Sequence, residues 1–258
     1  MRYGLVISVE HFTHPSLRSL PGAAADGERV AQYLRDPERG ACNDVWILRD
    51  PTKMEIELAL SKTLEAASRS DGIAIVYIAS HGVTRDRNGL WLCPTDTDPD
   101  RVAATALSVQ HIAAHVAEQT PRASIFIFDV CNAGGLASAA AAMALDQLWA
   151  ESVGTNVAMP DGHFLLGACS TTEYAGEHNT GGVFTSLLLD QLEALAHENP
   201  HLVVLLVEMV AGRVVAAARD IFNDQRPTWS GVAISGQVVL SRNPTSYRTH
   251  RDRSRVRT

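Results

Sequence analysis

The chain has 258 residues, of which 46% are hydrophobic and 20% charged, and its net charge is -7. This composition excludes extensive disorder across the body of the protein and is typical of a folded globular chain. A helix-covered α/β sheet often uses this length in one core, so we expect a single domain over residues 1–241. No apolar run could span a bilayer and the N-terminus lacks a signal-peptide layout, so we expect a cytoplasmic location without membrane contact.

Strands and helices alternate along the first half of the chain. A strand over 4–9 and a helix that follows Gly22 form one unit. A strand over 44–48 and a helix opened by a capping box at Thr52 form a second. Residues 72–79 are apolar on both faces, which predicts a central strand of a parallel sheet.

The alternation continues through the second half of the chain. Further elements are expected as a small hairpin at 90–92, a helix over 108–119, a strand over 123–128, an Ala-rich helix, a strand over 163–169, helices over 184–195 and 202–222, and a last strand over 232–240. This order predicts an α/β fold with about six strands in a mostly parallel sheet and helices on both faces. In such folds, sites form beyond the carboxyl ends of the strands.

Two of the predicted strands each end in a residue suited to nucleophilic catalysis. His81 follows the strand over 72–79, and Cys131 follows the strand over 123–128. A thiol nucleophile needs a base for its proton, and imidazole titrates near neutral pH. If the strands are neighbours, the two side chains converge as a catalytic dyad; a loop histidine and an ordinary buried cysteine are the alternative.

Glycines accompany both residues. A tetrahedral intermediate places negative charge on oxygen, which backbone N–H groups stabilise best where no Cβ obstructs them. The amides of Gly82 and Cys131 are the expected oxyanion donors.

The motifs ASHG at 79–82 and FDVCNAG at 128–134 resemble those of the caspase, metacaspase and orthocaspase group of cysteine peptidases. The resemblance covers about residues 3–240 and extends to LPGAAAD at 20–26 and to GVFT at 182–185. It implies a caspase-like fold and hydrolysis of peptide bonds through a thioester on the cysteine. One departure is plain, because many metacaspases have Ser-Gly-His-Gly where this chain has Ala79 at the first position.

In metacaspases, two acids bind P1, the side chain that precedes the cut. Asp26 and Asp129 occupy the matching positions. Two carboxylates in one partly desolvated pocket repel each other unless a cation binds between them, so they should select Arg or Lys. Relatives that cut after Asp carry a pocket arginine, and only Arg18 lies near the corresponding loop. A first-turn or N-cap acid is the alternative for Asp26, and a structural hydrogen-bonding acid for Asp129.

No Lys or Arg occurs from residue 123 to residue 212. Many relatives cut themselves in the linker after the catalytic strand, and a peptidase specific for Arg or Lys would need a basic residue there. We therefore hypothesise that the enzyme works as a single uncut chain.

The chain offers little sign of a metal or cofactor. HENPH at 197–201 matches the zinc motif H-E-x-x-H, but Pro200 ends a helix between the two histidines, so we expect no zinc. A calcium-like run from Asp96 lacks the glycine and the final glutamate of an EF-hand, although some metacaspases bind calcium through scattered aspartates. We expect no cofactor, with calcium activation as the alternative that stays open.

Four cysteines lie far apart at 42, 93, 131 and 169, which suggests reduced thiols and no disulfide framework. Cys169 is the rival nucleophile, but no further His-Gly motif accompanies it. A basic tail over 242–258 combines six arginines with one acid. Nucleic-acid binding is one interpretation of this tail, and a solvated disordered end is the one we favour.

The sequence therefore predicts a cysteine endopeptidase that acts on protein or peptide substrates with a basic P1 residue. The alternative is a catalytically idle caspase fold that serves as a scaffold or binding module. By resemblance alone, the protein would be bacterial, would act in cell death or antiviral defence, and could have a regulatory protein partner.

Overall fold

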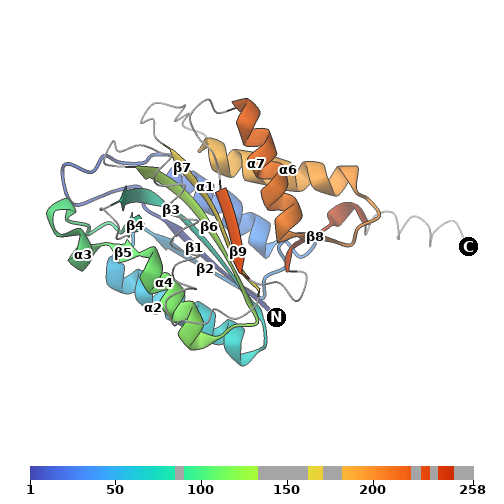
Figure 1. The fold of residues 1–258 in the computed structure, drawn as a ribbon, viewed down its shortest axis with the longest axis horizontal. Coiled ribbons are helices and arrows are strands. Elements are labelled where there is room, and N and C mark those ends of the chain that lie inside the picture. The colour runs from blue at the N-terminus through green and yellow to red at the C-terminus, as the bar shows by residue number, and fades with distance from the viewer. Residues whose placement is uncertain (85–89, 133–161, 171–181, 222–227, 233–237, 247–258) are drawn as a thin grey trace, which may run out of the picture.

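Apolar segments build a central β-sheet in the computed structural model (Figure 1). The described residues are 1–84, 90–132, 162–170, 182–221, 228–232 and 238–246. The main strands lie in the order β2, β1, β3, β6, β7, β9, and all pairs are parallel except β7 with β9. Their bounds are β1 Arg2–Ser8, β2 Asp44–Arg49, β3 Ile73–Thr84, β6 Ala123–Asn132, β7 His163–Ser170 and β9 Thr228–Val232. The predicted mostly parallel sheet is confirmed, and two short strands, β4 and β5, extend it to eight strands among the described residues.

Helices cover both faces of this sheet (Figure 1). On one face, Ile75 and Tyr77 of β3 pack in a core with α1, α6 and α7; on the other, Val76 and Ile78 pack in a core with α2 and α4. This alternation follows from the period of two along a strand, and it explains why β3 is apolar on both faces. The helices are α1 Ala23–Arg35, α2 Lys53–Arg69, the 3-10 turn Pro99–Arg101, α3 Val102–Thr105, α4 Val109–Gln119, α6 Val183–Glu198 and α7 Val207–Ile221. The predicted Ala-rich helix lies outside the described residues.

Two helices begin where the sequence predicts, and in both a side chain caps the first turn. Thr52 caps α2 as expected, since its hydroxyl accepts from the amide of Glu55 while the Glu55 carboxylate accepts from the amide of Thr52. Ser108 caps α4 by accepting from the amide of His111. These contacts set the register of two helices that pack on the same face of the sheet.

Strands β3 and β6 continue past their predicted ends. β3 runs to Thr84 and carries His81 inside the strand, and β6 runs to Asn132 and includes Cys131. The extension of β3 is paired by β4 Leu90–Cys93, which confirms the predicted hairpin, and β4 in turn pairs with β5 Leu107–Ser108. The extra pairing satisfies backbone groups that would otherwise end the strand before His81.

The prediction of a last strand over 232–240 is wrong. β9 ends at Val232, and the later residues form β10 Val239–Arg242, which pairs with β8 Val204–Leu206 in a separate two-stranded sheet. β8 also shortens the predicted helix over 202–222, so that α7 begins at Val207. A three-residue strand has too little pattern to separate from the apolar helix that follows it.

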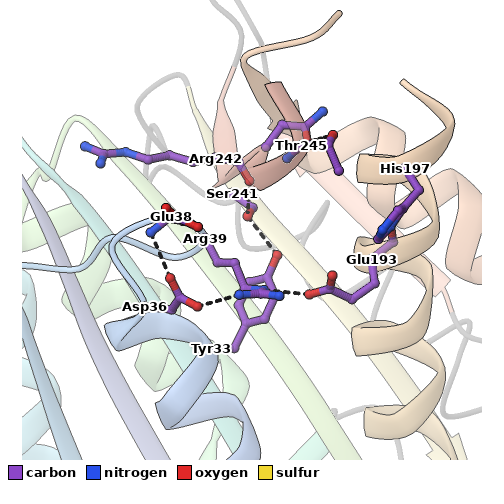
Figure 2. Close-up of polar contacts among 10 residues, drawn as sticks. Tyr33, Asp36, Glu38, Arg39, Glu193, His197, Ser241, Arg242 and Thr245 are labelled. Atoms are coloured by element: carbon purple, nitrogen blue, oxygen red, sulfur yellow. Dashed lines mark hydrogen bonds and ion pairs between the residues drawn. The ribbon is translucent and has the colours of Figure 1, made fainter. Parts of the chain in front are cut away.

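At the carboxyl end of α1, polar contacts tie this helix to α6 (Figure 2). The Arg39 guanidinium lies 2.5 Å from Asp36 and 2.6 Å from Glu193 of α6, and the hydrogen bond to Glu193 raises the pKa of Arg39 above its ordinary value. The Tyr33 hydroxyl shares a 2.7 Å hydrogen bond with Ser241 of β10, and burial raises the pKa of Tyr33 to about 12. The far ends of α1 and α6 are therefore joined independently of any contact near their amino ends.

The folded part of the chain reaches at least Ser246. Arg242 donates to the carbonyl of Pro37, and Asn243 and Ser246 are buried. The first residues of the expected tail over 242–258 thus pack on the domain, and residues 247–258 lie outside the described part. None of the described helices is both long and apolar enough to cross a membrane.

Candidate active site

His81 and Cys131 lie side by side in the sheet. They are Cα partners in the parallel pairing of β3 with β6, and Cys131 is also the Cα partner of Ser170 in β7. Neighbouring strands are about 4.8 Å apart, and paired positions of parallel strands share one face of the sheet. The structure therefore brings together the two backbone positions that the sequence singled out.

The imidazole of His81 is buried, with 7% of the residue exposed, and one of its nitrogens has a defined partner. Nε2 lies 2.8 Å from the carbonyl oxygen of Arg18. A carbonyl oxygen only accepts, so Nε2 carries a proton and the neutral ring has its lone pair on Nδ1. Arg18, whose side chain is exposed, thus contributes its backbone to the site.

A second contact fixes the plane of the His81 ring. Phe12 stacks on the imidazole with ring centroids 4.8 Å apart and an interplanar angle of 29°. The segment that holds Phe12 and Arg18 is itself anchored, because Asp50 accepts from the amides of Glu10 and His11. Burial acts to raise the pKa of Asp50, but the hydrogen bonds from this segment together outweigh burial, so the pKa lies below its ordinary value.

Gly82 has a packing reason to be glycine. A Cβ at this position would lie 2.4 Å from Cγ1 of Val130 and 2.9 Å from Cδ1 of Leu90. Gly82 stands between β6 and β4, where its Cα partners are Asn132 and Leu92. The close approach of these side chains requires a residue without a Cβ, whatever the role of its amide.

Asp26 is a buried acid, with 2% of the residue exposed, in the first turn of α1. It does not cap the helix, since Gly22 holds the N-cap position. Its Oδ2 accepts a 2.5 Å hydrogen bond from the amide of Gly182, and its Oδ1 lies 3.5 Å from Nη1 of Arg29. Burial raises the pKa of Asp26 to about 7, and the charge of Asp129 adds to this rise.

Asp129 faces the same helix end from β6. Its Oδ2 accepts a 2.7 Å hydrogen bond from the hydroxyl of Thr185, which also shares a 2.6 Å hydrogen bond with the buried hydroxyl of Tyr77. Burial raises the pKa of Asp129, and the hydrogen bonds with Thr185 and Tyr77 oppose that rise. Hydrogen bonding of this kind is what the structural interpretation of Asp129 anticipated.

The two acids converge on Gly182, the N-cap residue of α6. A Cβ built on Gly182 would lie 2.8 Å from Oδ2 of Asp26 and 3.2 Å from Oδ2 of Asp129. We call Asp26 and Asp129 the carboxylate pair. The two acids are far apart in the sequence, and the positive end of the α6 dipole lies beside both.

Two other cysteines are poorly suited to nucleophilic attack. Burial raises the pKa of Cys42 to about 11 and that of Cys93 to about 12, and both are free thiols. At neutral pH, both therefore remain in the unreactive thiol form. Cys169 lies in β7 beside Val130 of β6, one position before the partner of Cys131.

The rejected metal motif is not assembled. His197 is in the last turn of α6, whereas His201 follows the end of that helix. Within the described ranges, no group of three or more His, Cys, Asp or Glu is arranged to hold a metal ion. Asp96 accepts from the amide of Lys53 at the start of α2, which gives it a structural role.

Several residues of the site carry no signal in the sequence. The carbonyl of Arg18 could come from any residue type, and Phe12 lies in a loop of irregular composition. Thr185 belongs to the GVFT run at 182–185, and the resemblance of this run, which opens a helix, is the available signal. Tyr77 reads as one more apolar residue of a buried strand.

Over most of its length, the chain is similar to one protein family and to solved structures. A family model described as a caspase domain matches residues 1–239. Among solved structures, caspase-1 from Spodoptera frugiperda is similar, with a TM-score of 0.63 and 15% identity over 93% of this chain and 89% of that chain. No curated protein sequence matches this chain.

Proposed function

The chain belongs to the caspase-domain family, and from that premise we propose that it is a cysteine endopeptidase with a Cys131–His81 dyad that cleaves after Arg or Lys. The observation that carries the proposal is the in-register pairing of His81 with Cys131 between β3 and β6. Paired positions share one face of a parallel sheet, which is the arrangement that a nucleophile and its base require.

The proposed reaction uses the nitrogen of His81 that does not face Arg18. Nδ1 takes the thiol proton of Cys131 while the sulfur attacks the carbonyl carbon of the scissile bond. The resulting tetrahedral intermediate collapses to a thioester as the leaving amine takes the proton from Nδ1. Water, deprotonated by the same nitrogen, then attacks the thioester, and the acid product and the free thiol are released. The carbonyl of Arg18 and the ring of Phe12 support this role because they fix the tautomer and the plane of the imidazole.

The amides of Gly82 and Cys131 are the proposed donors to the oxyanion. Support for Gly82 is positional, because it follows His81 directly in β3. Its absent side chain has a separate explanation in the packing of Val130, so the glycine alone does not favour the catalytic role.

The carboxylate pair supports basic specificity. Two acids that converge on Gly182 are costly to keep charged in a buried site, and a cation that enters between them relieves that cost. Asp129 lies two residues before Cys131 in the same strand, which supports a P1 site close to the proposed nucleophile. The absence of Lys and Arg from 123 to 212 supports an enzyme that acts uncut, because a basic specificity then leaves no target in that stretch.

A catalytically idle scaffold is the second candidate. Its support lies in the family, since a caspase fold does not require activity, and in the hydrogen bonds that give Asp129 a structural role.

Hydrolysis of matched fluorogenic peptides that end in Arg, Lys or Asp tests the proposal, with the wild type compared with Cys131→Ala. We expect cleavage after Arg or Lys that disappears in the variant. Cleavage after Asp would overturn the assignment of the carboxylate pair, and cleavage that survives in Cys131→Ala would overturn the dyad. A folded wild type that cleaves none of the peptides would favour the scaffold.

A further inference from the structure

A basic residue of the protein itself already lies against the carboxylate pair. Arg29 is one turn after Asp26 on α1, and its Nη1 lies 3.5 Å from Oδ1 of Asp26. The same nitrogen donates a 2.9 Å hydrogen bond to the hydroxyl of Ser186 on α6. Ser186 thus holds the guanidinium beside a carboxyl group that the proposed function reserves for substrate.

Two helices and two strands contribute polar groups around the carboxylate pair. α1 contributes Asp26 and Arg29, β6 contributes Asp129, and β3 contributes the hydroxyl of Tyr77. α6 contributes three neutral groups, which are the amide of Gly182 and the hydroxyls of Thr185 and Ser186. These described groups comprise two acids and one cation, so the site has a net charge of -1 when both acids are ionised.

Both carboxylate oxygens of Asp26 already have partners, which limits the acceptor sites left for a substrate. Its Oδ2 accepts from Gly182, and its Oδ1 faces Arg29. A carboxylate binds a guanidinium best through two parallel bonds, one to each oxygen. An incoming basic side chain has to share Asp26 with Arg29. Two cations that contact the same carboxylate repel each other.

We propose that Arg29 is a specificity-determining residue that competes with the P1 cation for Asp26 and so sets how tightly basic side chains bind. This inference rests on the proposed function and deepens it. Arg29 also favours the ionised form of Asp26 when no substrate is bound, because an adjacent cation stabilises a carboxylate. Its two effects oppose each other: Arg29 weakens binding of the P1 cation once Asp26 is ionised, and it extends activity to lower pH.

The two effects separate with pH. At pH 8.5, where Asp26 is ionised in either protein, Arg29→Gln should lower KM for Arg and Lys peptides roughly three- to tenfold, since a partly exposed cation contributes only modestly. Without Arg29 the pKa of Asp26 rises above about 7, so the acid limb of kcat/KM should move to higher pH by about half a unit. A purely structural role would not produce this pair of opposite changes.

Two further variants serve as matched controls. Arg29→Lys keeps the charge and should retain the KM and the acid limb of the wild type. Arg39→Gln removes an arginine that joins α1 to α6 at their other end, away from the carboxylate pair, and should leave KM unchanged. Melting temperatures of all variants show whether each one is folded.

The experiment measures KM and kcat/KM from pH 5.5 to 9 for the Arg and Lys peptides. Lower KM at pH 8.5 with a shifted acid limb in Arg29→Gln alone supports the inference. An active enzyme in which Arg29→Gln changes neither quantity, or changes them as Arg39→Gln does, overturns the inference and leaves the proposed function standing. A wild type that cleaves after Asp, or cleaves nothing, overturns the proposed function and this inference with it.

Discussion

Replacement of the buried acid Asp26 by asparagine should make the protein more stable at alkaline pH. Asparagine has nearly the same shape and can still accept from the amide of Gly182, but it carries no charge that burial could penalise. The substitution removes one member of the carboxylate pair, so the same change that stabilises the fold should abolish selection for basic residues. Such a trade of stability for function is common at active sites.

The magnitude follows from the pKa of Asp26, which burial raises from 3.8 to about 7. Between these pH values the folded protein keeps a proton that the unfolded chain has released, so the free energy of unfolding falls as pH rises. The contribution of the protonated Asp26 to stability is fully present below about pH 4 and is lost as pH rises through about 7. Three pH units correspond to about 4 kcal/mol. The pKa of about 7 already includes the attraction of Arg29 for the ionised Asp26. With a discount for solvent screening, Asp26→Asn should gain roughly 2 kcal/mol at pH 8.

Urea unfolding at pH 4.5, 6 and 8 measures this effect. We expect the stability difference between Asp26→Asn and the wild type to grow with pH and to level off above pH 7. Asp190→Asn, which removes an exposed acid of α6, is the control and should show no such trend. If Asp26→Asn is less stable than the wild type at pH 8, then the contacts with Gly182 and Arg29 outweigh the cost of burial, and the reasoning is refuted.

Three further changes have defined outcomes. Phe12→Ala should lower kcat about tenfold with little change in KM, because the His81 ring loses the aromatic surface that fixes its plane. Phe12→Tyr keeps that surface and should retain most activity, so equal losses of kcat in both variants would contradict this role. Gly82→Ala should destabilise the fold by about 1–3 kcal/mol in urea unfolding, and Val130→Ala in the same chain should restore part of it, unless the contact is relieved by backbone movement. Thr52→Ala should cost about 1 kcal/mol through loss of the capping box of α2, and an unchanged urea midpoint would argue against that cap.

Much of the fold could be predicted because the central strands have a distinctive pattern. β3 and β6 are apolar on both faces, and that pattern marks neighbours in the middle of a parallel sheet. The pairing of His81 with Cys131 follows from two such strands that end at the same level. Local chemistry also sufficed for the start of α2, where a capping box is visible in four residues.

Other features depend on contacts between distant segments and could not be predicted. β8 and β10 are short, and each is a strand only because the other pairs with it. The carbonyl of Arg18 becomes part of the site through the path of a loop, which residue type does not reveal. Asp26 lies in the first turn of α1, as one interpretation of this acid expected, and its binding of a P1 side chain stays a prediction.

The central claim, a thiol nucleophile at Cys131 activated by His81, is tested most directly by covalent labelling. The protein is treated with a peptidyl acyloxymethyl ketone that carries Arg at P1, and the modified residue is located by peptide mapping with mass spectrometry. We expect a label on Cys131, much slower labelling in His81→Ala, and none on Cys42 or Cys93, whose thiols burial keeps protonated. A label on Cys169 in place of Cys131, or equal labelling rates with and without His81, would contradict it.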